Sequence, residues 1–543
     1  MSRKPLGKTD DESSESISGK QTADCGRGSA TRRRFLQSTA AAGALTAGFS
    51  VGSTSVVAES ADAGIPTPRL HVDGNLIKDP EGNTVKLRGL NIADPRRIDA
   101  TAPSRGKTAV QTIDYLTDQD EGWYPRVIRI PTQPGDIGGL APVPVADWQY
   151  PEPPSFDEDD LVAYCENHLD PVVERCGERN VYAIIDYHRH WGGGALQWND
   201  PVLDEEVRMY WEYVAERYGD EEHVVFEVYN EPTSPQLAGQ LVDDEGNVHE
   251  DWLEVAQPWV DIIRGHSDNV ILIGSHNYSQ RPEAAVIAPF EGKNLAYTYH
   301  IYPQHQVSQQ QGWDEYDTAL ESVVTPDGTP VYEEHPLFVT EFGWEDENLD
   351  TFYLLQGTCE EFGDPFLEFL ESSDAISWTA WCADPIWRPV MFTRGYIDED
   401  PFDPEDEDAI GDPYSEEVEE RCPDLPCDWE LLGDDHGEFM GEAIRAHLEE
   451  YKDHGIPQAE GDSEPDNGSE ELDVTGDGNP AQDLTGDALY EDVTGDGNLG
   501  FNDVVTFFEE HDGEIVQGNV EYFDFSDNGS VGFNDVVALF ERL

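Results

Sequence analysis

Basic side chains are scarce in this chain, whose 543 residues include 32 Lys and Arg against 114 Asp and Glu, for a formal net charge of −82. A surface this acidic repels the phosphates of nucleic acids and the headgroups of anionic membranes, so neither is expected as a partner. Long apolar runs are also missing, and we expect no membrane span. A neutral substrate is compatible with this charge. Hydrophobic residues at 38% still supply a sizeable core.

Cysteine is sparse, with seven residues, of which Cys25 lies near the N-terminus. Cys165 and Cys176 fall in one predicted helix about 16 Å apart, at 1.5 Å per residue, which is too far for a disulfide. Cys422 and Cys427 lie in a proline-containing loop and are the expected local pair. No CxxC spacing typical of a metal site occurs.

The N-terminal segment indicates export. Thr31–Gln37 carries consecutive arginines, and the apolar run after it, Ser38–Ser50, is too short and too weakly hydrophobic to span a membrane. This pattern resembles a twin-arginine export signal, with cleavage expected near Ala58–Ala63. Residues 1–63 are therefore predicted to be a signal region, and the protein to be secreted and extracellular. The acidic, lysine-poor composition resembles that of proteins secreted by salt-loving archaea; an unusually acidic mesophilic protein is the alternative.

Eight short apolar runs recur between about Leu70 and Tyr451, most of them continuous, as in strands buried on both faces. They are Val85–Ile92, Arg126–Pro131, Val181–His188, Val224–Glu231, Asn269–His276, Leu295–Tyr302, Leu337–Gly343 and Ala375–Cys382. Segments between them, such as Asp159–Arg179 and Asp204–Tyr218, have helical spacing. The pattern predicts an α/β fold, a (β/α)₈ TIM barrel over residues 64–451, rather than a doubly wound open sheet. Leu70–Val85 is predicted to be a hairpin that closes the bottom of the barrel.

Polar residues gather where the predicted strands end, which is the catalytic face of such a barrel. Two carboxylates stand out, Glu231 at the end of the fourth strand and Glu341 at the end of the seventh. These strands lie across the barrel mouth from each other, so the two carboxylates can face one substrate. Glycoside hydrolysis needs such a pair, about 5–5.5 Å apart for retention of configuration and about 6.5–9.5 Å apart for inversion. The sequence does not give the distance.

Seven motifs in order resemble the cellulase branch of glycoside hydrolase family 5, over about residues 66–451. They are Leu87–Asn91, Val127–Pro131, Ile185–His188, Asn230–Pro232, Tyr299–Tyr302, Val339–Gly343 and Trp378–Trp381. The resemblance implies a retaining mechanism without a cofactor, with Glu231 as acid/base and Glu341 as nucleophile. It further implies that Asn230 binds the sugar 2-hydroxyl, and that Arg129 and Tyr302 keep Glu341 ionised. His300 is expected near Glu231, His188 near the sugar, and Trp381 stacked on it.

The implied activity is that of a secreted endo-β-1,4-glucanase acting on a β-glucan. Tyr278 stands where cellulase relatives often carry Trp, and Cys382 begins a second departure from the family's pattern, so a β-mannanase is the alternative. A non-catalytic carbohydrate-binding or assembly protein is a further one. Trp191, Trp198, Trp344 and Trp387 follow strands at the catalytic face and either line glycan subsites or pack loops.

The C-terminal segment contains a repeat of period 32, in which Asp492–Asp503 recurs as Asp524–Asp535 and each copy runs into a short amphipathic helix. Oxygen side chains at loop positions 1, 3, 5 and 12, with Gly at 6, match an EF-hand-like calcium loop, although position 12 is Asp instead of Glu. The predicted Ca²⁺ ligands are Asp492, Thr494, Asp496, Asn498 and Asp503 in the first copy and Asp524, Ser526, Asn528, Ser530 and Asp535 in the second.

This pair of loops resembles a dockerin, a small α-helical module that binds a cohesin partner. We therefore expect a linker over residues 452–472 and a dockerin-like module over residues 473–543, with a cohesin-type protein as partner. A calcium-stabilised cap without a partner is the alternative.

Overall fold

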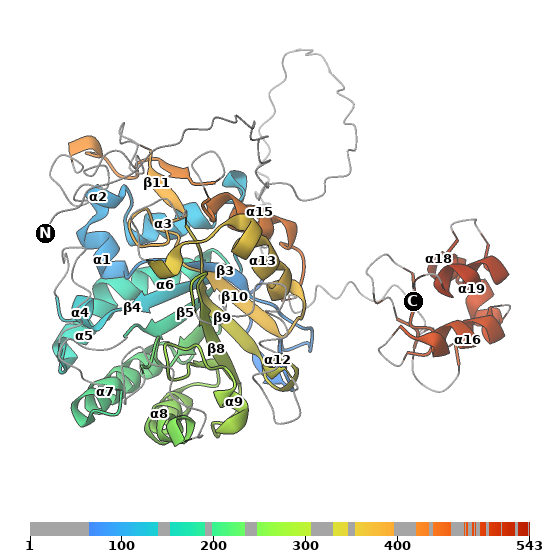
Figure 1. The fold of residues 1–543 in the computed structure, drawn as a ribbon, viewed down its shortest axis with the longest axis horizontal. Coiled ribbons are helices and arrows are strands. Elements are labelled where there is room, and N and C mark those ends of the chain that lie inside the picture. The colour runs from blue at the N-terminus through green and yellow to red at the C-terminus, as the bar shows by residue number, and fades with distance from the viewer. Residues whose placement is uncertain are drawn as a thin grey trace, which may run out of the picture. The chain divides into compact units, whose positions relative to one another are not determined.

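The computed structural model describes residues 65–139, 152–189, 198–233, 247–305, 330–345, 353–395, 420–433, 438–457 and most of 472–542. The predicted signal region and most of the predicted linker lie outside these residues. The chain divides into two compact units, residues 1–459 and 460–543 (Figure 1). Among the helices in the described ranges, none combines the length and apolar character that a bilayer crossing requires.

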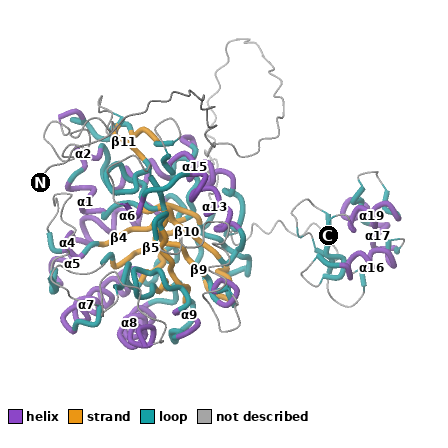
Figure 2. The backbone as a smooth tube through the Cα atoms, in the orientation of Figure 1, coloured by secondary structure: helices purple, strands orange, loops and turns teal. Residues whose placement is uncertain are grey.

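The first unit is built around a closed barrel of eight parallel strands in the order β10-β3-β4-β5-β6-β7-β8-β9 (Figure 2). Each of the eight predicted runs coincides with one of these strands, with β4 extending one residue past its run to Thr132, so the predicted barrel is confirmed. The strands are β3 (Arg88–Asn91), β4 (Val127–Thr132), β5 (Tyr182–Tyr187), β6 (Val224–Glu227), β7 (Ile271–Ile273), β8 (Leu295–Ile301), β9 (Leu337–Phe342) and β10 (Ile376–Ala380). All of their residues are buried, because the barrel interior covers one face and the helices cover the other.

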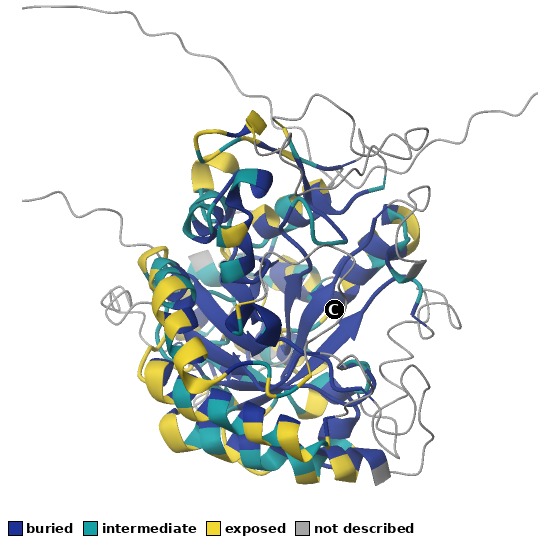
Figure 3. Cartoon of the chain, turned by 90° about the vertical axis from the view of Figure 1, so that its left-hand side faces the viewer, coloured by how far each residue is buried: buried dark blue, intermediate teal, exposed yellow. Residues whose placement is uncertain are grey.

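Helices surround the barrel and turn their exposed residues outward (Figure 3). Within the described residues of the first unit, the helices are α1 (Pro95–Ala100), α2 (Ala102–Arg105), α3 (Ala109–Leu116), η1 (Gln119–Glu121), α4 (Pro134–Ile137), α5 (Glu158–Tyr164), η2 (Cys165–Leu169), α6 (Asp170–Glu178), α7 (Pro201–Tyr218), α8 (Asn247–His266), α9 (Ala284–Ile287), α12 (Val331–Glu334), η4 (Tyr353–Leu355), η5 (Cys359–Gly363), α13 (Asp364–Glu371) and α15 (Gly441–Glu450). The predicted helix at 159–179 is α5 and α6 joined without a break by the π-helical η2.

The predicted N-terminal hairpin is confirmed. Strands β1 (His71–Asp73) and β2 (Leu76–Lys78) pair antiparallel around Gly74, whose φ of 61° suits the tight turn. Leu70, Ile77 and Val85 join an apolar cluster with inward-facing residues of the barrel strands, including Val127 and Tyr182. The hairpin therefore seals the amino-terminal end of the barrel, opposite the catalytic face.

The predicted local disulfide is present between Cys422 and Cys427, whose Cα atoms are 6.1 Å apart. It lies just before β12 (Trp429–Leu431), which pairs with β11 (Phe392–Arg394) after the last barrel strand. Cys165 and Cys176 are buried and free, as their predicted separation requires. Residues 452–457, where the predicted linker begins, still contact the barrel, because the Gly455 carbonyl accepts a hydrogen bond from the Lys86 amide.

The second unit contains α16 (Phe501–Glu510), α17 (Glu514–Gly518), α18 (Val520–Phe523) and α19 (Phe533–Phe540). Helices α16 and α19 follow the two repeated loops, and they pack against each other. Their inward residues, among them Phe507 and Leu539, form an apolar core with Val493 and Phe523.

Candidate active site

Arg129 on β4 is fully buried at the centre of the catalytic face and organises the groups around it. Its Nη1 donates to Glu341 Oε1 at 2.8 Å, and its Nε donates to Glu227 Oε2 at 2.6 Å. Its remaining contacts are Glu227 Oε1, Asn230 Oδ1, Asn91 Oδ1 and Asp186 Oδ2, all between 2.8 and 3.0 Å. One guanidinium fork thus fixes three carboxylates and two amides.

Glu341 on β9 is held by two donors. The Arg129 guanidinium occupies one carboxylate oxygen, and Tyr302 Oη donates to the other at 3.0 Å. Burial raises the pKa of Tyr302 well above its ordinary value, and the charge of Glu341 raises it further, so the phenol stays protonated as a donor. The structure therefore brings the predicted partners Arg129 and Tyr302 to Glu341, one donor to each carboxylate oxygen.

Glu231, four residues beyond the end of β6, has a different partner. The Nδ1 atom of His300 lies 2.8 Å from Glu231 Oε1 and 3.6 Å from Glu341 Oε2, so the imidazole edge faces both carboxylates. Burial by itself lowers the pKa of His300, but Glu341, Glu227 and Glu231 together raise it to about 10. The three side chains of Glu231, His300 and Glu341 each offer an atom within 4.8 Å of the others.

The aromatic wall of the site consists of His188, Trp381 and Trp387. The rings of His188 and Trp381 are stacked with centroids 5.4 Å apart and an angle of 4° between planes, and Trp387 stacks on Trp381 at 5.6 Å. The indole of Trp381 donates to the Arg388 carbonyl, which fixes the ring. Sugar faces are apolar, so a flat wall of this kind suits one.

Asn230 and Tyr278 complete the predicted set. The amide oxygen of buried Asn230 accepts from Arg129, and its Nδ2 has no hydrogen-bond partner within the described ranges. A donor left open in this way is what a sugar hydroxyl needs. Tyr278, in the turn after β7, is half-buried, and its amide donates to the Pro232 carbonyl. Burial raises the pKa of Tyr278, with a smaller contribution from Glu231, which places the ring near that carboxylate.

The family comparison decides the identity of this arrangement. The model of the cellulase family, glycosyl hydrolase family 5, matches residues 78–385, which is 308 of the 543 residues. The chain belongs to glycosyl hydrolase family 5. The matched range includes every residue of the candidate site described above except Trp387 and Arg388.

The relatives of this family 5 chain are distant. An endoglucanase of a Bacillus species is 28% identical over 228 residues, 38% of this chain and 22% of the relative. A cellulase of a Thermoanaerobacterium species is 24% identical over 327 residues, 58% of this chain and 69% of the relative. The chain spans about a quarter of the length of the first three endoglucanases that it matches. A solved β-glucanase from Saccharophagus degradans in complex with cellotetraose is 21% identical, with a TM-score of 0.46, covering 60% of this chain and 87% of that one.

Three buried residues of the family 5 site were not anticipated from the sequence, namely Asp186, Glu227 and Thr340. Asp186 Oδ2 lies 2.7 Å from His188 Nδ1, and burial raises the pKa of Asp186 well above its ordinary value although Arg129 opposes the shift. Glu227 receives both the Arg129 fork and the Thr340 hydroxyl. For the two acids, the available signal was a charged residue inside a run that is otherwise apolar; Thr340 gave no such signal.

Of the two roles considered for the loop tryptophans, lining a glycan subsite or packing a loop, the structure favours packing for two of them. Trp198 and Trp344 are almost completely buried, and the indole of Trp198 donates to the Thr233 carbonyl. The subsite alternative is therefore wrong for these two. Trp387 is half-buried against Trp381 and remains part of the aromatic wall. Trp191 lies outside the described residues.

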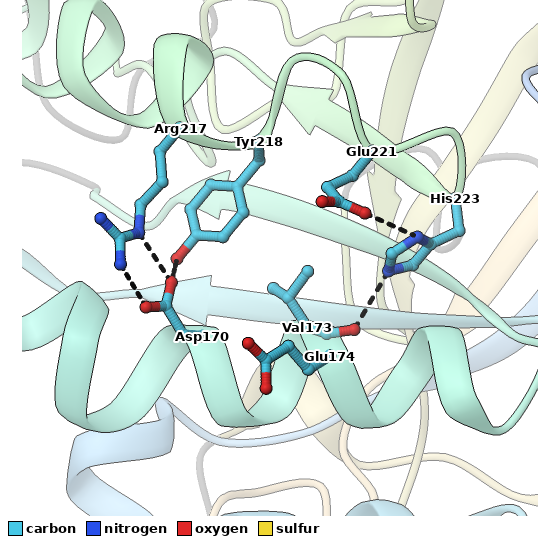
Figure 4. A pocket seen from close by; sticks show the side chains of 7 residues that line it. All are labelled: Asp170, Val173, Glu174, Arg217, Tyr218, Glu221 and His223. Carbon is cyan, nitrogen blue, oxygen red and sulfur yellow. Dashed lines mark hydrogen bonds and ion pairs between the residues drawn. The ribbon is translucent and has the colours of Figure 1, made fainter.

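A shallow pocket on the helical shell does not belong to this site. It lies beside α6 and the end of α7 and is lined by Asp170, Val173, Glu174, Arg217, Tyr218, Glu221 and His223 (Figure 4). Asp170 accepts hydrogen bonds from Arg217 and Tyr218, and His223 Nε2 pairs with the Val173 carbonyl. These polar groups bind one another, so the pocket offers no convergent set for a substrate.

Next to the site, two buried histidines predict a sensitivity to acid. His276, in the turn after β7, has its Nε2 3.1 Å from His249 Nδ1 on α8. Burial lowers the pKa of His249 to about 4 and that of His276 to about 3, below the value of about 6.5 in an unfolded chain. Folded-state pKa values below the unfolded value mean that the neutral pair stabilises the fold above pH 6.5. That stability is lost as the pH falls toward 4.

We expect His276→Gln to reduce this loss. Between pH 7 and pH 4.5 the free energy of unfolding should fall by about 2 kcal/mol more in the wild type than in the variant, since one pKa unit corresponds to about 1.4 kcal/mol. Denaturant unfolding followed by tryptophan fluorescence measures the difference. His71→Gln, the same change at a partly exposed position, is the control. Equal pH dependence in wild type and His276→Gln would contradict the interpretation.

Proposed function

We propose that this protein is a retaining endo-β-1,4-glucanase that hydrolyses internal bonds of cellulose-like polysaccharides. The observation that carries the proposal is the pair of carboxylates at the barrel mouth. Glu341 is hydrogen-bonded to Arg129 and Tyr302, and Glu231 is hydrogen-bonded to His300. An oxygen of Glu231 and one of Glu341 lie within 4.8 Å of each other. This short separation favours retention, because inverting enzymes need room for a water between carboxylates about 6.5–9.5 Å apart.

In the proposed reaction, the ionised Glu341 attacks the anomeric carbon while Glu231 passes a proton to the glycosidic oxygen. The bond to the leaving sugar breaks and a glycosyl ester forms on Glu341. Water, deprotonated by Glu231, then attacks the same carbon and releases Glu341. Asn230 Nδ2 donates to the 2-hydroxyl, and Trp381 supports the apolar face of the sugar. Every step uses groups of this chain and no cofactor.

The test is hydrolysis by the full chain lacking its signal region. We expect reducing-sugar release and a rapid loss of viscosity with carboxymethyl-cellulose, because internal cleavage shortens chains quickly. Proton NMR of a cello-oligosaccharide digest should show the β-anomer as first product. The α-anomer as first product would overturn retention, and activity confined to chain ends would overturn endo action.

A β-mannanase is the second candidate, favoured by Tyr278, whose half-buried ring lies near Glu231 in place of the Trp common in cellulase relatives. Release from mannan with none from carboxymethyl-cellulose would select it. If the folded protein hydrolysed neither polymer, the non-catalytic carbohydrate-binding alternative would be favoured.

The same proposal includes secretion through the twin-arginine route and function in concentrated salt. The arginine-containing segment 31–37 supports export, and the net charge of −82 supports salt, since screening shortens the range of self-repulsion to about 3 Å at 1 M. Comparison of hydrolysis in dilute and multimolar salt tests the second point. Appearance of the enzyme in the medium, and its loss when the consecutive arginines are replaced by lysine, tests the first.

Calcium binding by the second unit is proposed from its donor set. Asp492, Asp503 and Asp535 are fully buried, and hard carboxylate oxygens are the ligands that Ca²⁺ prefers. The two loops have the same hydrogen-bond pattern. Asp503 accepts from the Thr494 and Gly500 amides, and Asp535 accepts from the amides 32 residues later, of Ser526 and Gly532. Asp496, Asn498 and Asn528 lie outside the described residues.

We expect the full chain to bind two Ca²⁺ ions in titration calorimetry, against a salt background that suppresses weak binding to surface acids. The double variant Asp503→Asn/Asp535→Asn should bind none, because each loop loses its closing carboxylate. Chelation should lower the thermal stability of the second unit and leave hydrolysis of soluble glucan intact. Binding of two ions by the double variant would contradict the assigned ligands, and loss of hydrolysis would contradict a metal-free reaction.

A cohesin-type partner is proposed from the outer face of the same helices. Phe501, Val505 and Phe508 on α16 are exposed, and so are the equivalent residues of α19, Phe533, Val537 and Phe540. Ring contacts between Phe501 and Phe540 and between Phe508 and Phe533 join the two stripes into one apolar patch. Exposed patches of this kind support partner binding over the alternative of a stand-alone cap. Pull-down by an immobilised cohesin, abolished by Phe501→Ser/Phe533→Ser, tests it.

A further inference from the structure

The hydrogen-bond chain behind the acid/base carboxylate has a fixed direction. Glu227 is buried, and although burial alone would raise its pKa, Arg129 and His300 lower it below the ordinary value, so the carboxylate is ionised and only accepts. Thr340 Oγ1 therefore donates its single proton to Glu227 Oε1, at 3.1 Å. The same hydroxyl oxygen lies 2.9 Å from His300 Nε2. Having given its proton away, Thr340 must accept one, and His300 Nε2 must carry it.

The backbone places Thr340 for this contact. Strands β8 and β9 pair Tyr299 with Val339 and His300 with Glu341, so a bulge leaves Thr340 without an opposite residue. Along β9, Phe338 belongs to the inward-facing cluster and Val339 to the cluster shared with the helices, so in a regular strand Thr340 would face the barrel and Glu341 would face the helices. The bulge allows both side chains to reach groups inside the barrel, which is how bulges re-aim residues next to active sites.

We propose that Glu227 and Thr340 are positioning residues that keep a proton on His300 Nε2, so that the Nδ1 edge shares the transferable proton of the reaction with Glu231. Whether this proton resides on Glu231 or on His300, the pair holds one, in the contact between Oε1 and Nδ1. It leaves to the glycosidic oxygen in the first step and returns from the attacking water in the second. This inference rests on the proposed glycosidase function.

Without the Thr340 hydroxyl, the Nε2–H of His300 loses its acceptor inside the protein. The imidazolium form then becomes less favourable, and the pair gives up its proton at lower pH. The charged and titratable groups that face His300 from the surrounding elements are retained in such a variant. They are Glu227, Glu231 and Glu341, whose carboxylate oxygens lie 2.8–3.9 Å from the ring nitrogens, and Asp186 and His305, which interact with the ring electrostatically. Arg129 and Tyr302 contact Glu341 in turn.

The test compares pH profiles of kcat/KM on carboxymethyl-cellulose for the wild type, Thr340→Val and Thr340→Ser. Thr340→Val keeps the shape and removes the hydroxyl, so we expect the alkaline limb to move down by at least one pH unit, about a tenfold loss on that limb. Near the acid end of the plateau the rate should stay within about threefold of wild type. Thr340→Ser keeps the hydroxyl and should restore the limb. Thr298→Val is the matched control, since Thr298 is buried on β8 and its hydroxyl has no partner among the described residues.

A second readout does not depend on hydrolysis. In full-length protein labelled with ¹⁵N-histidine, the His300 signals, assigned by their absence in His300→Gln, should show a protonated Nε2 in the wild type and in Thr340→Ser. The Nε2 proton should be lost or shared in Thr340→Val. An unmoved alkaline limb together with unchanged His300 signals would overturn the proposal. Inactivity of the wild type on every glucan, with the expected His300 signals, would instead count against the proposed function. It would leave intact the inference that Glu227 and Thr340 keep a proton on His300 Nε2.

Discussion

Replacement of Glu341 by Gln should lower kcat on carboxymethyl-cellulose by at least about 10⁴-fold, the scale on which loss of a covalent nucleophile acts. The amide cannot form the glycosyl ester, yet it retains the size of the carboxyl group. Its oxygen can still accept from Arg129 Nη1 or Tyr302 Oη, which hold the present carboxylate at 2.8 and 3.0 Å. The fold and the binding of oligosaccharide should therefore persist. Initial rates and calorimetric binding of a cello-oligosaccharide to the variant measure both.

The matched control is Glu333→Gln, the same change at an exposed position on α12, which should leave kcat unaltered. A Glu341→Gln variant that kept more than about 1% of the wild-type rate would exclude Glu341 as the nucleophile. If oligosaccharide binding disappeared together with turnover, the loss would instead reflect damage to the Arg129 network.

The fold was largely predictable because the eight strands are buried on both faces. Continuous apolar runs such as that around Ile184 and Ile185 are a strong signal, and their number suggests a barrel. Strand ends were harder to predict. β6 stops at Glu227, whereas the apolar pattern continues to Glu231, because hydrophobicity does not report where ladder hydrogen bonds end.

The site was predictable only where a polar residue ends a predicted apolar run. Glu231, Glu341 and their immediate partners meet this condition, and the structure brings them together. Glu227 and Thr340 face inward by simple alternation along their strands, but a continuous apolar run does not reveal which face is inward, and Glu341 reaches the barrel interior only through a bulge that no local pattern encodes. Half-buried tryptophans and fully buried ones look alike in the sequence, so Trp344 could not be separated from Trp387. Burial is decided by packing between distant segments.

A carboxylate at the amino-terminal end of the barrel is expected to contribute strongly to the stability of the first unit. Glu371, the last residue of α13, accepts from both Arg88 Nε and Nη2 and lies 2.9 Å from Lys86 Nζ. It also accepts from the indole of Trp378 on β10 and lies 3.2 Å from His447 Nε2 on α15. Burial alone would raise the pKa of Glu371, but these partners lower it well below its ordinary value. One carboxylate thus joins the first and last strands, where the barrel closes, to two helices.

Glu371→Ala should therefore destabilise the first unit by about 3–5 kcal/mol, because it leaves two buried cations without their counter-charge. All 13 tryptophans precede residue 430, so fluorescence during denaturant unfolding reports this unit alone. Lys293→Ala removes the exposed ion pair with Asp268 and should leave the transition where it is. Glu371→Gln should fall between wild type and Glu371→Ala, since it loses the charge but keeps an acceptor for Arg88. If Glu371→Ala unfolded at the wild-type denaturant concentration, the Glu371 contacts would not be what stabilises barrel closure. The hydrogen bonds between β10 and β3 and the apolar contacts of the N-terminal hairpin would then suffice, and water would have to solvate the charges of Lys86 and Arg88.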